Sequence, residues 1–165
     1  MAHDASEAEL VAAWRAAADD PAIGAALRSL HAIVANEVRQ RRPICLASGR
    51  CCHFEAHGHR LYVTGLEAAW CVRERAARGS ITTLDQIAQA RERGDCPYLV
   101  NGRLCGAHAE RPLGCRIYFC DQRAQEWQQD LYERTHRALV ELHERHAIPY
   151  RYGEWRGMLE RVCGV

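Results

Sequence analysis

The sequence contains no lysine, because all twenty-two of its basic residues are arginines. This excludes enzymes that form a lysine Schiff base and nucleotide-binding proteins of the P-loop type, since both need a lysine ammonium group. The formal net charge is only +1, so no basic excess indicates nucleic-acid binding. The Gly-x-Ser-x-Gly and Gly-x-Gly-x-x-Gly motifs are also absent, which leaves hydrolase and dinucleotide-binding functions without support.

Long apolar segments are missing as well. No stretch approaches the ~20 apolar residues that a membrane span needs, and residues 1–7 lack the basic and apolar regions of a secretory signal. We therefore expect a cytoplasmic protein without a membrane partner. Disulfides are rare in that compartment, so the nine cysteines are expected to be metal ligands or redox groups.

The hydrophobic pattern predicts a mainly α fold with a single helical domain over residues 1–165. A chain of this length buries enough surface to fold without metal or disulfide staples. The predicted helices cover residues 6–19, 21–41, 64–77, 83–93, 124–146 and 153–163. Two of them begin at capping boxes, Ser6 with Glu9 and Thr64 with Glu67. We interpret Glu67 as a capping residue and not as a catalytic carboxylate.

Two cysteine-rich loops interrupt this helical frame. Residues 43–60 and 106–121 show no helical period and are predicted to be irregular, with a short strand at 61–63 between the first loop and the next helix. Asn101-Gly102 predicts the tight turn of a small β-hairpin that brings Cys96 and Cys105 together. Residues 43–121 are thus expected to form a cysteine-cluster region framed by N-terminal and C-terminal helices.

Seven cysteines in these segments are candidate metal ligands. Thiolate sulfur is a preferred ligand of zinc and of iron–sulfur clusters, and both need several thiolates that converge from different segments. The candidates are Cys45, Cys51, Cys52, Cys96, Cys105, Cys115 and Cys120. Adjacent side chains diverge in extended backbone, so either Cys51 or Cys52 is expected to stay outside the ligand shell. Cys71 and Cys163 lie on predicted helices and are interpreted as structural.

The cysteine pattern resembles that of the YkgJ-type cysteine-cluster family, whose members are described as zinc- or iron-chelating domains. That family carries Cys-x-x-Cys-x-x-Cys-Cys, a helix introduced by Thr-x-x-Glu, and then Cys-Pro followed by Cys and by Arg-Pro-x-x-Cys-Arg. The matching residues here are Cys45, Cys51, Cys52, Thr64, Glu67, Cys96, Pro97, Cys105, Arg111, Pro112, Cys115 and Arg116. The resemblance covers residues 43–121 and implies that this region binds metal.

One position departs from the family pattern, since Ser48 stands where the second cysteine is expected. Serine is a poor ligand for zinc or iron, and Cys120 is a candidate for supplying the missing sulfur. Three further side chains are expected to surround the metal without being its principal ligands. Arg111 and Arg116 would stabilise thiolates by charge and by hydrogen bonds, and His53 directly follows Cys52.

One structural zinc and one 4Fe-4S cubane each take four ligands, so ligand number alone does not decide between them. The surplus of cysteines favours an iron–sulfur cluster, for example a 4Fe-4S cubane, as the expected cofactor. Zinc is the alternative. The first reading predicts an electron-transfer, cluster-carrying or other redox-linked role, and the second predicts a structural zinc module that serves as an interaction scaffold. A small enzyme that uses the cluster region is a third possibility, because some relatives in the resembled family look like flagellin lysine methylases. The sequence indicates no particular protein partner.

Overall fold

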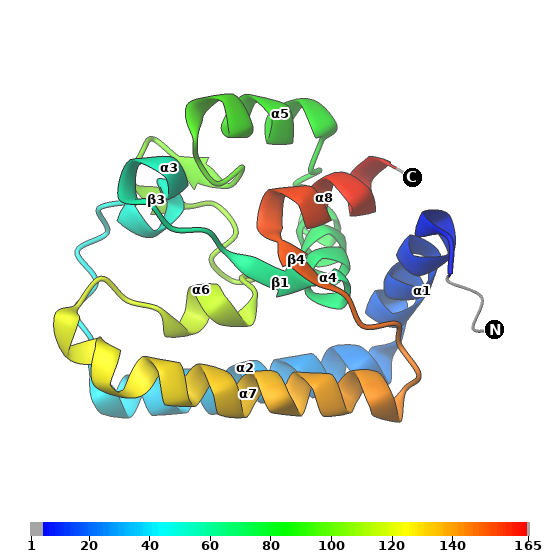
Figure 1. Ribbon diagram of the computed structural model, residues 1–165, viewed down its shortest axis with the longest axis horizontal. Helices are drawn as coiled ribbons and strands as arrows, with labels where there is room; N and C mark the ends of the chain where they lie inside the picture. Colours follow the sequence, from blue (N-terminus) through cyan, green and yellow to red (C-terminus); the bar gives the residue numbers. More distant parts are fainter. Residues whose placement is uncertain (1–4, 165) are drawn as a thin grey trace.

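The computed structural model describes residues 5–164, and its fold is mainly helical, as the sequence predicts (Figure 1). Residues 1–4 and 165 of the predicted domain lie outside the described residues. The α-helices are α1 (Glu7–Asp19), α2 (Pro21–Arg41), α3 (Phe54–His57), α4 (Gly65–Ala77), α5 (Leu84–Arg93), α6 (Leu113–Ile117), α7 (Gln125–Arg145) and α8 (Trp155–Gly164). The remaining elements are the 3-10 helices η1 (Arg50–Cys52) and η2 (Gln122–Ala124) and the strands β1 (Tyr62–Thr64), β2 (Leu99–Val100), β3 (Leu104–Cys105) and β4 (Tyr152–Glu154).

Both predicted capping boxes are confirmed. At the start of α1 the Glu9 carboxylate accepts a hydrogen bond from the Ser6 amide at 2.7 Å, and the Ser6 hydroxyl accepts from the Glu9 amide at 3.3 Å. At the start of α4 the Glu67 carboxylate accepts from the Thr64 amide at 2.8 Å, and the Thr64 hydroxyl accepts from the Glu67 amide at 3.2 Å. These side chains satisfy amide groups that have no partner within the helix.

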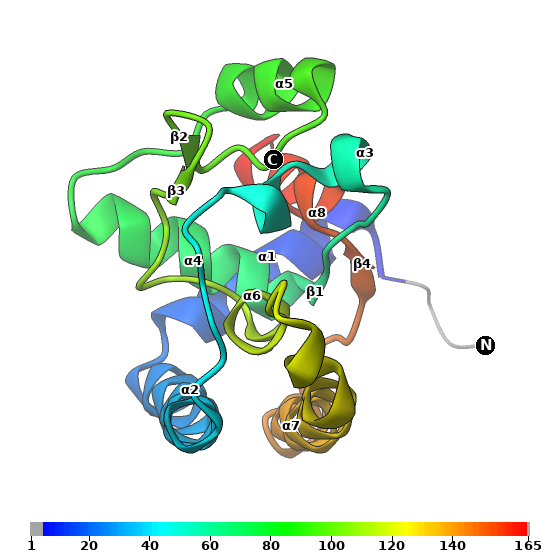
Figure 2. The ribbon, with the colours of Figure 1, turned by 90° about the vertical axis from the view of Figure 1, so that its left-hand side faces the viewer.

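The helices form two groups that share one hydrophobic core. The long helices α2 and α7 lie side by side with α6 resting on both, which Figure 2 shows from their ends. In the second group α4 packs against α1 and α8, and α5 packs against α8. The core runs through both groups and includes fully buried side chains such as Trp14, Leu27, Leu66, Leu139 and Leu159. None of the helices within residues 5–164 is long and apolar enough to cross a membrane.

Two small antiparallel sheets complete the fold. The hairpin of β2 and β3 places Leu99 opposite Cys105, which confirms the predicted hairpin. The other sheet pairs β1 with β4 and places Tyr62 opposite Glu154. This second pairing was not predicted, because residues 153–163 had been assigned entirely to a helix and the strand at 61–63 had no partner. Strands this short are held by tertiary packing and leave little alternation in the sequence.

The two cysteine loops are more regular than predicted. The first loop contains η1 and α3, and the second contains the single turn of α6. Helices of three to five residues are shorter than the window in which a helical period becomes visible in a sequence. The loops were therefore correctly placed, whereas the prediction that they are irregular was wrong for these short elements.

Candidate metal centre

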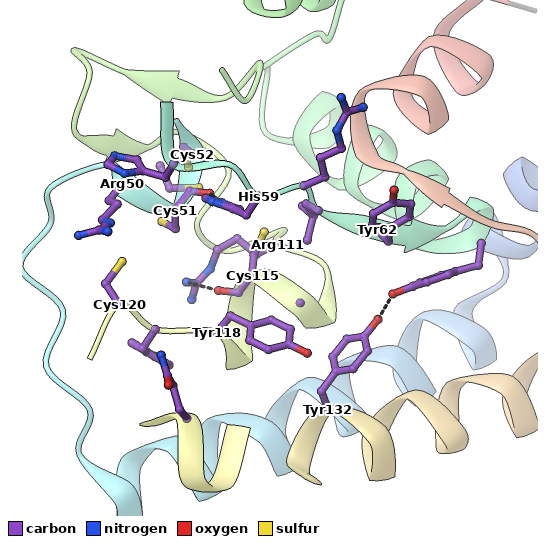
Figure 3. A pocket seen from close by; sticks show the side chains of 18 residues that line it. Arg50, Cys51, Cys52, His59, Tyr62, Arg111, Cys115, Tyr118, Cys120 and Tyr132 are labelled. Carbon is purple, nitrogen blue, oxygen red and sulfur yellow. Dashed lines mark hydrogen bonds between the residues drawn. The ribbon is translucent and has the colours of Figure 1, made fainter. Parts of the chain in front are cut away.

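Three segments of the chain bring thiols to one cavity of about 580 Å³ (Figure 3). Cys51 and Cys52 come from η1, Cys105 comes from the end of β3, and Cys115 and Cys120 come from α6 and the turn that follows it. Five of the seven predicted ligands thus line this one cavity, and we call the part that they form the cavity wall. The hairpin and α6 place thiols from sequence-distant loops next to those of η1.

The other two candidate ligands lie outside the cavity wall. Cys96 is buried behind Cys52, and its amide donates a hydrogen bond to the Cys52 carbonyl at 2.7 Å. Cys45 is exposed. The neighbouring Ile44 amide donates to the Asp121 carboxylate at 2.9 Å, which ties the Cys45 segment to the turn that carries Cys120. Cys45 therefore lies at the rim of the cysteine region.

The Cys52 thiol is at the centre of the group. Its contacts with the thiols of Cys105, Cys51 and Cys96 raise its pKa. Contact with Cys52 in turn lowers the pKa of the Cys51 thiol to about 6 and that of the Cys105 thiol to about 7, and the positive charge of Arg111 adds to both shifts. A lowered pKa favours the thiolate, which is the form that binds metal.

The chemistry of the wall fits a soft metal. The lining contains five cysteines and no aspartate or glutamate among the described residues. Thiolates suit zinc and iron–sulfur clusters, whereas magnesium and calcium need oxygen ligands. Within residues 5–164, no three histidine, cysteine, aspartate or glutamate side chains are arranged so that they could hold a metal ion.

A buried indole N–H group next to the thiols also favours thiolate ligands. The indole N–H of Trp155 has no hydrogen-bond partner among the described residues. The pKa of the Cys96 thiol is lowered first by its contact with Cys52 and further by this indole. A thiolate at Cys96 would therefore satisfy an N–H group that is otherwise left unpaired in the core, and such hydrogen bonds to sulfur tune metal sites.

The two predicted arginines have different positions. Arg111 lines the cavity and donates to the carbonyls of His108 at 2.9 Å and Cys115 at 3.1 Å. Arg116 lies behind the loop and donates to the carbonyls of Arg111 and Ala109, each at 2.7 Å. Neither arginine forms an ion pair with a carboxylate in the described part of the chain. Both fix the backbone around Cys115, and Arg111 leaves positive charge beside the thiols.

His53 holds the first loop against the hairpin. Its Nδ1 lies 2.8 Å from the Asp95 carboxylate and its Nε2 lies 2.9 Å from the Gly102 carbonyl. These two contacts, the carbonyl first, raise the pKa of the imidazole. Because both ring nitrogens are engaged and His53 does not line the cavity, its role in this structure is to position the neighbouring Cys52.

Glu67 has a second contact that the capping motif does not reveal. The carboxylate also accepts a hydrogen bond from the Leu113 amide at 2.9 Å, at the start of α6. Burial raises the pKa of this carboxyl group. A single buried side chain thus caps α4 and binds the N-terminus of the helix that carries Cys115.

Substitution of Gly49 is expected to separate the first cysteine loop from the hairpin. Gly49 has φ +74°, and a Cβ atom there would lie 2.5 Å from the Gly102 carbonyl oxygen and 2.9 Å from the Arg103 Cα. We expect Gly49→Ala to reduce the free energy of unfolding by about 2–4 kcal/mol, measured by urea denaturation. The matched control is Gly58→Ala, since Gly58 has φ +64° with no atom within 4 Å of a Cβ. Equal losses in the two variants would contradict the proposed clash.

The far end of the cavity is lined by residues that the sequence did not single out. These are the tyrosines Tyr62, Tyr118, Tyr132 and Tyr152. They come from β1, the turn after α6, helix α7 and β4, and no common spacing connects them. A predicted pairing of β1 with β4 would have indicated that Tyr62 and Tyr152 lie close together, but the sequence analysis does not predict that pairing.

In comparisons with family models, with curated proteins and with solved structures, nothing matches the chain. The resemblance to the YkgJ-type pattern therefore stays a prediction from the motif residues. The function of this chain has to be argued from its own thiols and from the cavity that they line.

Proposed function

We propose that this protein binds an iron–sulfur cluster through the thiols of the cavity wall and serves in electron transfer or in carrying the cluster. The observation that supports this most strongly is the convergence of five thiols, from three separate segments, on one cavity without a carboxylate. A zinc ion and a 4Fe-4S cluster each take four protein ligands, so ligand number alone does not decide between them. We favour the cluster because the thiols are in surplus over one such shell.

The ligands would come from the five wall cysteines, with Cys96 close behind them. The sequence predicts that the side chains of Cys51 and Cys52 diverge in extended backbone. In the structure both residues lie in the 3-10 helix η1 with their thiols in contact, so either thiol, or both, would be available to the shell. The thiols would have to be deprotonated to hold the cluster. The cluster would supply a centre that accepts and releases one electron. Arg111 would offset the negative charge of the thiolates, and the Trp155 N–H would stabilise sulfur at Cys96.

The resemblance of residues 43–121 to the YkgJ-type pattern supports the proposal, and we propose that family for this chain. We also propose a cytoplasmic location, because clustered cysteines that serve as metal ligands are suited to a reducing compartment.

A structural zinc site is the second candidate. Its support is the burial of Cys52 and Cys96 in the hydrophobic core and the backbone hydrogen bond between them. A zinc ion held there would link η1 to the hairpin segment, and the protein would then act as a scaffold without catalytic or redox activity.

Metal and sulfide analysis with an absorption spectrum, on protein purified without oxygen, tests both candidates. The proposal predicts about four irons and four sulfides per chain and a broad band near about 400 nm that bleaches with dithionite. About one zinc per chain without a visible band would replace the iron–sulfur proposal with the zinc scaffold. Fully reduced thiols with neither metal would contradict both.

A further inference from the structure

The end of the cavity that four tyrosines line, which we call the tyrosine end, does not offer the ligands that a soft metal prefers. Tyr62 and Tyr152 stand on the paired strands with their ring centroids 5.9 Å apart. Tyr118, just after α6, and Tyr132, on α7, have centroids 5.4 Å apart, and the hydroxyl groups of Tyr132 and Tyr152 are hydrogen-bonded. All four line the cavity, and Figure 3 labels three of them, Tyr62, Tyr118 and Tyr132. Phenol oxygens are not the ligands that soft metals prefer.

These rings are only partly covered by the protein itself. Tyr62 is 46% exposed, Tyr152 is 40% exposed and Tyr118 is 38% exposed. Exposed aromatic rings that line a cavity offer flat apolar surface for stacking and edge contacts. The cavity volume of about 580 Å³ lies within the range of ~300–1,000 Å³ that is typical of small-molecule sites.

Three arginines bring positive charge to the same cavity. Arg50, Arg60 and Arg111 line it, the lining contains no carboxylate, and none of the three forms an ion pair with a carboxylate in the described part of the chain. Arg111 lies between Cys51 and Tyr118 in Figure 3, so its charge serves both the thiols and the tyrosine end. Arginine is the side chain best suited to bind a carboxylate or phosphate group through paired hydrogen bonds.

We propose that the cavity binds a small organic anion that carries an aromatic ring. The ring would lie among the four tyrosines, and the anionic head would point to Arg50 and Arg111 beside the thiols. The inference names the class of ligand that would bind beside the proposed metal site. It rests on the proposed function in one respect, namely that the anionic head of the ligand would lie next to the cluster. Binding by the tyrosines and arginines themselves does not require metal.

The test uses three probes of similar shape on the protein as isolated, with the metal content of the same sample measured in parallel. The probes are the anion 2-naphthoate, the neutral 2-naphthalenemethanol and the cation 2-naphthylmethylammonium, titrated by calorimetry. We expect the anion to bind at least about tenfold more tightly than the other two, because only the anion forms charge-assisted hydrogen bonds to arginine. Equal binding of the three probes would overturn the inference.

Two variants assign the two ends of the ligand. Arg50→Gln is expected to weaken 2-naphthoate about tenfold and to leave the alcohol unchanged, whereas Tyr62→Ala is expected to weaken all three probes. The matched controls are Arg145→Gln, an exposed arginine without an ion pair among the described residues, and Tyr150→Ala, which is 46% exposed like Tyr62 but does not line the cavity. Unchanged 2-naphthoate affinity in Arg50→Gln would overturn the inference.

The two proposals fail in different ways. Absence of 2-naphthoate binding at millimolar concentration in protein that contains its metal would overturn the ligand inference and leave the proposed function intact. Selective binding that depends on Arg50 and Tyr62, in protein that holds no metal, would uphold the ligand inference and contradict the proposed function.

Discussion

Cys105→Ser is expected to lower the metal content of the protein at least about tenfold, because a hydroxyl group is a poor replacement for a thiolate at a soft metal. Cys105 is half-buried at the end of β3 and is the hairpin's thiol in the cavity wall. Metal per chain after purification without oxygen is the measurement. The result would show whether the hairpin contributes a ligand and does not merely cover the site.

Cys163→Ser is the matched control for this experiment. Cys163 is also half-buried and its pKa is raised by burial, but it lies on α8 and does not line the cavity. We expect this variant to keep the metal content of the parent protein. Cys51→Ser guards against a folding defect, because Cys51 is exposed and its replacement removes no core packing. Full metal content in both Cys105→Ser and Cys51→Ser would refute the assignment of the cavity wall as the metal site.

Glu67→Ala is expected to destabilise the fold by about 2–3 kcal/mol, which corresponds to a fall of roughly 4–12 °C in Tm. The substitution leaves the buried amides of Thr64 and Leu113 without their acceptor. The gain from no longer burying a carboxyl group, whose pKa is raised by that burial, offsets part of the loss. Thermal unfolding followed by circular dichroism, at matched metal content, measures the effect.

The capping box of α1 provides the control. Glu9 makes the same motif with Ser6, but it is exposed, and its carboxylate has no hydrogen bond to a second helix among the described residues. Glu9→Ala is therefore expected to lower Tm much less than Glu67→Ala. Similar effects of the two substitutions would mean that the contact between Glu67 and Leu113 contributes little, and that capping alone accounts for the role of this carboxylate.

Much of the helical frame could be predicted because its causes are local. Ser6, Thr64 and Thr83 accept hydrogen bonds from amides within the first turn of the helices that they begin. The hairpin follows from Asn101 and Gly102, which both have positive φ values in the structure. Such signals depend on residues only a few positions apart, so they can be recognised in a single sequence.

The candidate site could be predicted only in part. The cysteine spacing correctly pointed to the loops that meet at the cavity, yet it did not separate the exposed Cys45 from the thiols of the wall. It also placed His53 among the groups around the metal, which stays a prediction; in the structure its ring nitrogens contact Asp95, before the hairpin, and Gly102, in the hairpin turn. Sequence spacing limits which residues can meet, but side-chain direction is set by packing.

The sequence by itself determined the helices, the turn of the hairpin and the supply of thiols, because propensity, capping and residue chemistry act over short stretches of chain. Only the tertiary structure decided that β1 pairs with β4, that Glu67 reaches Leu113, and that four tyrosines and three arginines line one cavity. These contacts join residues far apart in the chain. Their formation depends on how the helices α4, α6, α7 and α8 pack around one core, and no local pattern of residues encodes that arrangement.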